Sequence, residues 1–235
     1  MCHAPLAGMI GTRPRRANEG KRVCFCALRG PSPAAGNFII KSGSNADQSS
    51  ASSYRYMSQR SFPTLHHLAD KAPREPVRVL MVCMGNICRS PTAHGVLEHM
   101  AACAARAVAV DSAGTHGYHE GAPPDTRAQA HAARRGYDLS RQRARRLRAQ
   151  DFTAFDLVLV MDEANEAAAH ALCPPAERHR LYRLTDFCRT LAVREVPDPY
   201  YGNAQGFERV LDIVEDACAG LLSCIAASVR KATAH

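Results

Sequence analysis

A cysteine and an arginine six positions apart lie in the stretch of this 235-residue chain that is best suited to chemistry. The stretch, VRVLMVCMGNICRSP, runs from Val77 through Cys83 and Arg89 to Pro91. Its first half is β-branched and apolar, which predicts a buried strand, while Ser90 can cap a helix whose first turn accepts the proline. The sequence therefore places a thiol and a guanidinium in a loop between a strand and a helix.

Such a strand–loop–helix junction is where α/β folds bind ligands, and backbone N–H groups with a helix N-terminus favour an anion there. We expect this setting to keep Cys83 ionised at neutral pH and Arg89 to grip two oxygens of a phosphate. Gly85 would let the backbone approach the anion, and Asn86 would accept a left-handed backbone conformation. The hydroxyl of Ser90 would donate to the thiolate. The loop is predicted to bind phosphate and to carry its own nucleophile.

Strands and helices alternate along the rest of the body. The predicted strands cover residues 77–84, 107–115, 155–162 and, as a short fourth strand, 180–187. The predicted helices cover residues 90–105, 123–136, 163–172 and 206–229. This alternation predicts an α/β fold with a parallel sheet that is covered on both faces. A basic run at residues 134–148 is interpreted as a solvated helix or loop face.

The N-terminal third has a different composition. Residues 1–75 carry 11 of the 30 Lys and Arg but only 4 of the 22 Asp and Glu, so the remainder is nearly neutral. A nucleic-acid-binding function for the whole chain therefore loses its main support. Low-complexity stretches such as SGSNADQSSASS predict that residues 1–75 are a disordered extension, or that translation starts downstream at Met57. An organellar transit peptide is a weaker alternative. Residues 76–235 are the predicted domain.

Ten cysteines are distributed without a repeating frame. Seven of them fall in the predicted domain, and this odd number argues against a secreted disulfide scaffold. The pair in CFC has no second pair at zinc-finger spacing. No stretch reaches the roughly 18 apolar residues of a membrane span. We expect a cytoplasmic protein that uses no metal, no cofactor and no membrane contact.

Several motifs together resemble one family. VCMGNICRSP is similar to the signature of the low-molecular-weight protein-tyrosine phosphatases, and DSAGT, GAPPDTRA, FDLVLVMDEAN and DPYYGN follow in the order of that family. The resemblance covers about residues 77–227. It implies a three-layer sandwich in which a four-stranded parallel sheet has helices on both faces, with the disordered extension preceding it.

The resemblance also implies a mechanism. Cys83 would attack the phosphorus of phosphotyrosine and form a phosphocysteine, while Arg89 and the loop amides stabilise the transition state. Asp198 would protonate the leaving phenolate and then activate water. No metal is required. Cys88 matches the second loop cysteine of the family, which can trap oxidised Cys83 as a disulfide, although a purely structural role for this small residue stays open.

The expected substrate is a tyrosine-phosphorylated protein, or a small aryl phosphate. Tyr200 and Tyr201 would stack on the phosphotyrosine ring, and Tyr118 stands where many relatives carry tryptophan. Met84 would form a flexible wall beside the thiol. Ile87 occupies the position at which relatives directed to phosphoarginine tend to carry threonine. Oligomeric state is left open.

Two alternatives remain at this point. Arsenate reduction uses a similar loop, and Cys173 with Cys188 resembles the additional thiol pair that such an enzyme needs. A phosphate-binding module without turnover is the second alternative. Retention of Cys83, Arg89 and Asp198 together argues against it, because a binder gains nothing from a general acid.

Overall fold

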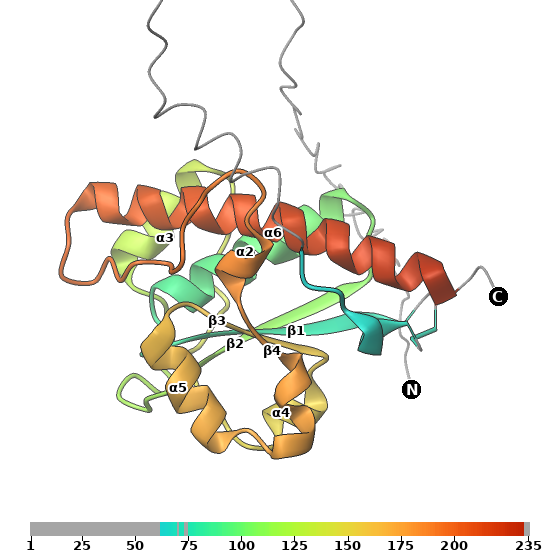
Figure 1. Ribbon diagram of the computed structural model, residues 1–235. Helices are drawn as coiled ribbons and strands as arrows, with labels where there is room; N and C mark the ends of the chain where they lie inside the picture. Colours follow the sequence, from blue (N-terminus) through green and yellow to red (C-terminus); the bar gives the residue numbers. More distant parts are fainter. Residues whose placement is uncertain (1–61, 70, 73–74, 233–235) are drawn as a thin grey trace, which may run out of the picture. The chain divides into compact units, whose positions relative to one another are not determined.

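The computed structural model describes residues 62–69, 71–72 and 75–232 (Figure 1). Its strands are β1 (Val77–Cys83), β2 (Val108–Gly114), β3 (Leu157–Val160) and β4 (Leu181–Arg183). Its α-helices are α2 (Arg89–Cys103), α3 (Thr126–Arg134), α4 (Asp151–Ala154), α5 (Glu163–Leu172) and α6 (Ala204–Ala232). Short 3₁₀ helices are η1 (His66–Leu68), η2 (Pro175–Arg180) and η3 (Leu184–Phe187).

The four strands form one parallel sheet in the order β2-β1-β3-β4. Strand β1 is central and pairs with β2 over its whole length, from Val77 opposite Val108 to Cys83 opposite Gly114. Its continuous apolar sequence follows from this position, because a central parallel strand is buried on both faces. The predicted four-stranded parallel sheet is confirmed.

Helices cover both faces of the sheet (Figure 1). Helices α2 and α6 pack on the face to which Met81 and Leu159 point, in the larger apolar cluster. On the other face, Leu80 and Val158 pack against Phe152 of α4 and against α5. Alternate residues of β1 therefore enter opposite cores, as the period of a strand requires. The three-layer α/β architecture is confirmed.

Two local predictions are wrong. Ser90 does not cap α2, because the helix begins one residue earlier, with Cys88 at the cap position, and the Ser90 hydroxyl faces Cys83 instead. The fourth strand is shorter than residues 180–187. Only Leu181–Arg183 pairs with β3, and the chain then turns into η3, where the Asp186 carboxylate accepts a hydrogen bond from the Arg183 backbone N–H.

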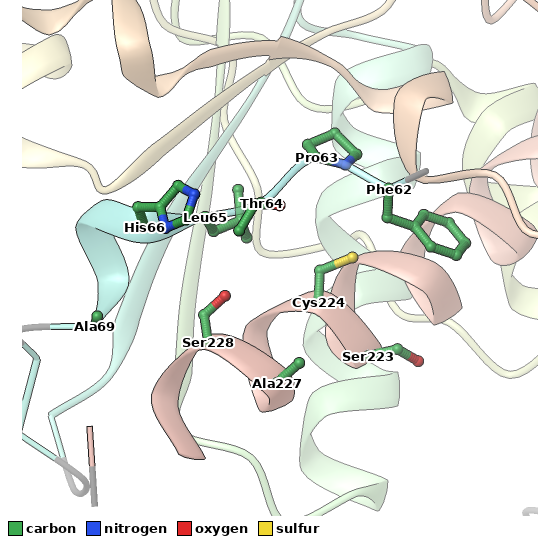
Figure 2. A pocket seen from close by; sticks show the side chains of 10 residues that line it. All are labelled: Phe62, Pro63, Thr64, Leu65, His66, Ala69, Ser223, Cys224, Ala227 and Ser228. Carbon is green, nitrogen blue, oxygen red and sulfur yellow. The ribbon is translucent and has the colours of Figure 1, made fainter. Parts of the chain in front are cut away.

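The folded body includes residues upstream of the expected boundary at 76. Leu65 and Leu68 are fully buried in the larger cluster, and the carbonyl of Asp156 lies 2.9 Å from Nε2 of His67. Ten residues from the stretches 62–69 and 223–228 line a hollow of about 320 Å³ (Figure 2). The expectations for the rest of the N-terminal segment, including a start at Met57, lie outside the described residues.

No helix in the described part of the chain, α6 included, is long and apolar enough to cross a membrane. Within those same residues, the structure contains no cluster of three or more His, Cys, Asp or Glu side chains arranged to hold a metal ion.

Candidate active site

Cys83 ends the central strand, and its side chain is 3% exposed. The thiol sulfur accepts a hydrogen bond from the backbone N–H of Asn86 at 3.3 Å and lies 3.0 Å from the hydroxyl oxygen of Ser90. Both partners belong to the short connection into α2. The sulfur is thus fixed between a backbone N–H and a hydroxyl at the start of the loop.

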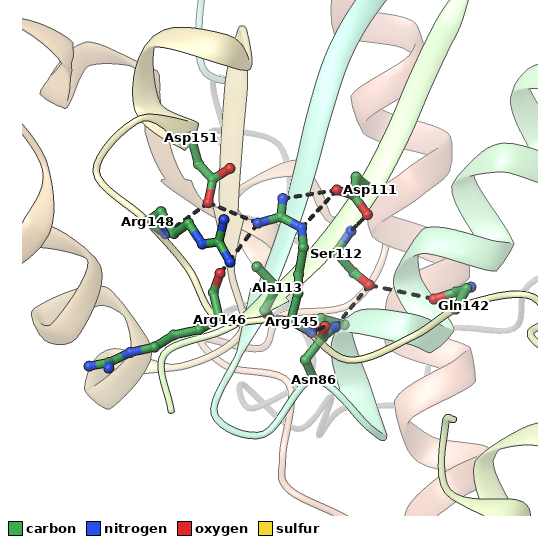
Figure 3. A network of polar contacts seen from close by, with 10 residues as sticks. Asn86, Asp111, Ser112, Ala113, Gln142, Arg145, Arg146, Arg148 and Asp151 are labelled. Carbon is green, nitrogen blue, oxygen red and sulfur yellow. Dashed lines mark hydrogen bonds and ion pairs between the residues drawn. The ribbon is translucent and has the colours of Figure 1, made fainter. Parts of the chain in front are cut away.

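Asn86 shapes the loop. Its backbone is left-handed, with φ of 54°, as its residue type predicted. Its side-chain amide donates to the hydroxyls of Ser90 at 3.0 Å and Ser112 at 2.8 Å, and its carbonyl accepts from the backbone N–H of Arg145 at 2.9 Å (Figure 3). The Ser112 hydroxyl donates onward to Gln142 at 3.5 Å. Buried polar groups that satisfy one another in this way hold the loop in one conformation.

The segment that contains Arg145 extends the edge of the sheet beside β2. The backbone N–H of Gly114 donates to the carbonyl of Arg145, and that of Leu147 donates to the carbonyl of Gly114, each at 2.8 Å. The guanidinium of Arg145 forms ion pairs with Asp111 at 2.8 Å and Asp151 at 3.0 Å (Figure 3). The basic run is therefore only partly a solvated face, because its half-buried Arg145 braces the loop.

Arg89 is 2% exposed and has carboxylate partners on two other segments. One terminal nitrogen donates to Asp162 and, at 3.3 Å, to the carbonyl of Val196; the other donates to Asp198 at 2.7 Å. Burial disfavours the charged guanidinium, but the charges of Cys83, Asp162 and Asp198 outweigh burial and raise the pKa of Arg89. The arginine is thus charged and fixed beside the thiol loop.

The structure places Asp162 against Arg89, although the sequence analysis gave this aspartate no role. It caps α5, because its carboxylate accepts the Asn165 backbone N–H at 2.7 Å, and its second oxygen holds Arg89. The signal in the sequence was its place directly after a buried strand. Side chains at the carboxyl ends of neighbouring parallel strands meet at one edge of the sheet.

The Asp198 segment carries the predicted aromatic residues. One carboxylate oxygen of Asp198 accepts the Tyr200 backbone N–H at 3.1 Å while the other binds Arg89. The rings of Tyr200 and Tyr201 meet edge to face with centroids 4.9 Å apart. Tyr200 is partly exposed, whereas Tyr201 is 96% exposed. Tyr200 is therefore the better placed of the two to form a wall.

The loop that follows β2 lies beside the loop that follows β1 and begins after Cys83. The backbone N–H of His116 donates to the carbonyl of Met84 at 2.9 Å, and the ring of His116 stacks on Tyr118. Met84 is exposed, and Tyr118 is 82% exposed. A Cβ atom at Gly85 would lie 3.1 Å from the ring of His119, so the glycine leaves room for that ring. The structure thus places these predicted wall residues on two adjoining loops.

Ile87 and Cys88 contribute to a separate small apolar cluster. Cys88 is buried with Ala128 and Phe207, and Ile87 packs against this small cluster. Burial, with help from the charges of Asp125 and Cys83, raises the pKa of the Cys88 thiol to about 12. Cys88 is therefore a neutral thiol at ordinary pH, unlike a cysteine prepared for nucleophilic attack.

Fold and site together define an α/β enzyme of the protein-tyrosine phosphatase class. A family model described as low molecular weight phosphotyrosine protein phosphatase matches residues 78–234. The chain belongs to this family, as its motifs predicted.

Phosphatases from distantly related organisms are similar to this chain over most of their own length. A low molecular weight protein-tyrosine-phosphatase of Streptomyces coelicolor is 40% identical over 158 residues, which are 65% of this chain and 96% of the relative. The human low molecular weight phosphotyrosine protein phosphatase is 36% identical over 150 residues, 61% of this chain and 92% of the relative. A crystal structure of a protein tyrosine phosphatase from Entamoeba histolytica matches with a TM-score of 0.63 and 38% identity, covering 64% of this chain and 97% of that one.

Proposed function

We propose that this chain hydrolyses phosphotyrosine in proteins, and small aryl phosphates, through a phosphocysteine intermediate. One observation carries the proposal. Cys83 ends β1, and the loop that follows leads to a buried, charged Arg89 at the start of α2. This arginine contacts the Asp198 carboxylate at 2.7 Å. Nucleophile, anion-binding group and candidate acid thus converge from segments more than a hundred residues apart.

In the first step, the Cys83 thiolate attacks phosphorus, so an S–P bond forms and the bond from phosphorus to the phenolic oxygen breaks. Asp198 delivers its proton to that departing oxygen. The hydroxyl of Ser90 and the N–H of Asn86 stabilise the thiolate beforehand. Arg89 holds the equatorial oxygens, and Asp162 keeps its guanidinium in position.

In the second step, water attacks the phosphocysteine. The Asp198 carboxylate takes a proton from the water, a new P–O bond forms and the S–P bond breaks. Inorganic phosphate leaves, and Cys83 is again a thiolate. The mechanism requires no metal, because Arg89 and the loop amides neutralise the phosphate charge.

A phenolic phosphate is the substrate class that the walls favour. Tyr200, Tyr118 and Met84 stand on loops beside the thiol, where an aromatic ring can be stacked. Arsenate reduction fits less well, because Cys173 and Cys188 are buried in the two clusters on opposite faces of the sheet. We place the enzyme in the cytoplasm, since reducing surroundings keep a reactive thiol active.

The test is phosphate release from a phosphotyrosine peptide and an aryl phosphate by the full chain in the presence of a metal chelator. Cys83→Ser should lower turnover by at least about 10⁴-fold while vanadate still binds. Arg89→Ala should lose both turnover and vanadate binding. Substantial turnover by Cys83→Ser would overturn the proposal, and so would activity that the chelator removes.

A further inference from the structure

Arg127, on the first turn of α3, has no part in the mechanism described above, yet it contacts the segment that carries Asp198. Its Nε and one terminal nitrogen donate to the two carboxylate oxygens of Asp125, at 3.0 and 2.8 Å. Its other terminal nitrogen donates to the backbone carbonyl of Tyr200 at 3.0 Å. One planar guanidinium thus joins the start of α3 to a residue two positions after Asp198.

The same guanidinium lies over two aromatic rings. Its central carbon is 5.4 Å from the ring centre of Tyr200 and 5.0 Å from that of Phe207, which belongs to the first turn of α6. Arg127 therefore touches both ends of the connection between Asp198 and α6. Cation–π contacts and a hydrogen bond act together on a side chain that is still 45% exposed.

Asp125 connects Arg127 to the loop between Cys83 and Arg89, called the nucleophile loop below. The backbone N–H of Asp125 donates to the carbonyl of Ile87 in this loop at 2.8 Å. The contacts form a closed circuit that leaves the nucleophile loop at Ile87 and returns to it at Arg89. The circuit passes through Ile87, Asp125, Arg127, Tyr200, Asp198 and Arg89.

One contact in this circuit must change during catalysis. Arg89 binds Asp198 in the empty site, but a bound phosphate dianion engages the same guanidinium. Asp198 must then turn toward the leaving oxygen. Once its contact with Arg89 is released, the hydrogen bond from Arg127 to the carbonyl of Tyr200 still holds the Asp198 segment near the nucleophile loop.

We propose that Arg127 is a positioning residue that keeps Asp198 and the Tyr200 ring at a fixed distance from the nucleophile loop during leaving-group protonation. The inference rests on the proposed function and adds to it a residue on α3. Hydrogen bonds from Arg127 lower the pKa of Asp125, so this pair is charged at neutral pH. Lysine could bind Asp125, but it lacks the planar fork that also reaches Tyr200.

The experiment measures phosphoenzyme formation by the full chain on aryl phosphates that span a range of leaving-group pKa. For Arg127→Ala we expect a loss of about 10–100-fold on phosphotyrosine and of less than about 3-fold on the most activated ester, because misplacing an acid matters most for a poor leaving group. Arg127→Lys should show the same pattern. The inhibition constant of inorganic phosphate should change less than about 2-fold, because Arg89 is untouched.

Two comparisons separate positioning from general destabilisation. Arg134→Ala, which removes an exposed arginine from the other end of α3, should leave the leaving-group dependence unchanged. In an Asp198→Ala background, Arg127→Ala should add no further leaving-group dependence, because the acid is already absent. An equal loss at every leaving-group pKa, or an additive effect in the double variant, would overturn the inference.

A measurement without turnover distinguishes failure of this inference from failure of the proposed function. If the wild type hydrolyses no aryl phosphate, the proposed function is wrong, and amide hydrogen exchange then decides the role of Arg127. Arg127→Ala should accelerate exchange in residues 198–203 while exchange in residues 84–89 stays unchanged. Unchanged exchange in residues 198–203 would show that the arginine does not hold this segment.

Discussion

At Arg89, two carboxylates share one buried guanidinium, and their surroundings differ. Asp162 is fixed twice, as the cap of α5 and as a partner of Arg89. Asp198 lies in an irregular segment, and its side chain is 42% exposed. The residue that can turn toward a leaving group is therefore Asp198, while Asp162 is suited to orienting the arginine.

Asp198→Ala should slow phosphotyrosine cleavage by about 10²–10⁴-fold, with smaller losses on esters of more acidic phenols that need less protonation. Phosphate binding should persist or tighten, because Arg89 loses a carboxylate that competes with phosphate. Phosphoenzyme formation across an aryl phosphate series, together with phosphate inhibition, measures both effects.

An equal loss at every leaving-group pKa would contradict this assignment, and Asp162 would become the candidate acid. Asp162→Asn provides the matched variant. It should weaken phosphate binding, because Arg89 loses its orienting partner, and should leave the leaving-group dependence nearly unchanged.

Cys88 is a neutral thiol whose pKa is raised to about 12, mainly by burial. Peroxide should oxidise Cys83 to a sulfenic acid, which then condenses with Cys88 to a disulfide and releases water. Only the thiolate of Cys88 attacks, so closure of the disulfide should accelerate about tenfold per pH unit between pH 6 and 8. Mass mapping after a peroxide pulse at several pH values measures the disulfide, and a thiol reductant should restore activity.

Recovery of Cys83 only as sulfinic or sulfonic acid would show that Cys88 is structural. In that case the Cys88→Ser variant, treated with peroxide and then with reductant, should recover as much activity as the wild type. If the disulfide forms, this variant should lose activity irreversibly.

Among the elements, the segment at residues 144–147 has the most unexpected position. It adds backbone hydrogen bonds to the end of β2 and presents the N–H of Arg145 to Asn86. This N–H holds the side chain that stabilises the left-handed turn of the nucleophile loop. The geometry of the loop therefore depends on an element that supplies no reacting group.

Arg145→Ala removes the ion pairs with Asp111 and Asp151 that anchor this segment. We expect the melting temperature to fall by about 2–5 °C, as a network of partly exposed ion pairs implies, and kcat to fall several-fold with KM less affected. The control is Arg143→Ala, since the guanidinium of the exposed Arg143 donates to the nearby carbonyls of Ser140 and Gln142. Equal effects of the two substitutions on kcat would contradict a bracing role for Arg145.

Sequence patterns predicted the elements that build the site better than they predicted the contacts between those elements. A continuous apolar run identified β1, and its polar continuation identified the loop with Cys83 and Arg89. The cap of α2 was misassigned, because a serine before a proline fits a capping role as well as it fits a hydrogen bond to a thiol. The contacts of Arg145 and Arg127 were missed, since the sequence around an arginine gives no local signal of a partner distant in the chain.

At the scale of the whole molecule, the boundary of the folded body is the feature that a truncation series can test. Removal of residues 1–56 should leave the rate on small aryl phosphates and the melting temperature nearly unchanged, because their composition offers no core. Removal through Leu68 takes away two fully buried leucines and should destabilise the domain by several kcal/mol, at about 2–5 kcal/mol for each side chain. Thermal unfolding of both truncations gives the comparison. A large loss of stability in the shorter truncation would show that the N-terminal residues contribute to folding.

The hollow in Figure 2 is walled by residues 62–69 on one side and by the late turns of α6 on the other. Two stretches separated by more than 150 positions are therefore neighbours, and a short linker could join α6 to the stretch that begins at residue 62. A circularly permuted chain opened between Pro174 and Pro175, at the start of η2, would then contain Asp198 ahead of Cys83. The same site would still assemble, because its groups are brought together by the edge of the sheet. The order of the acid and the nucleophile along the chain is thus independent of how they are arranged in the site.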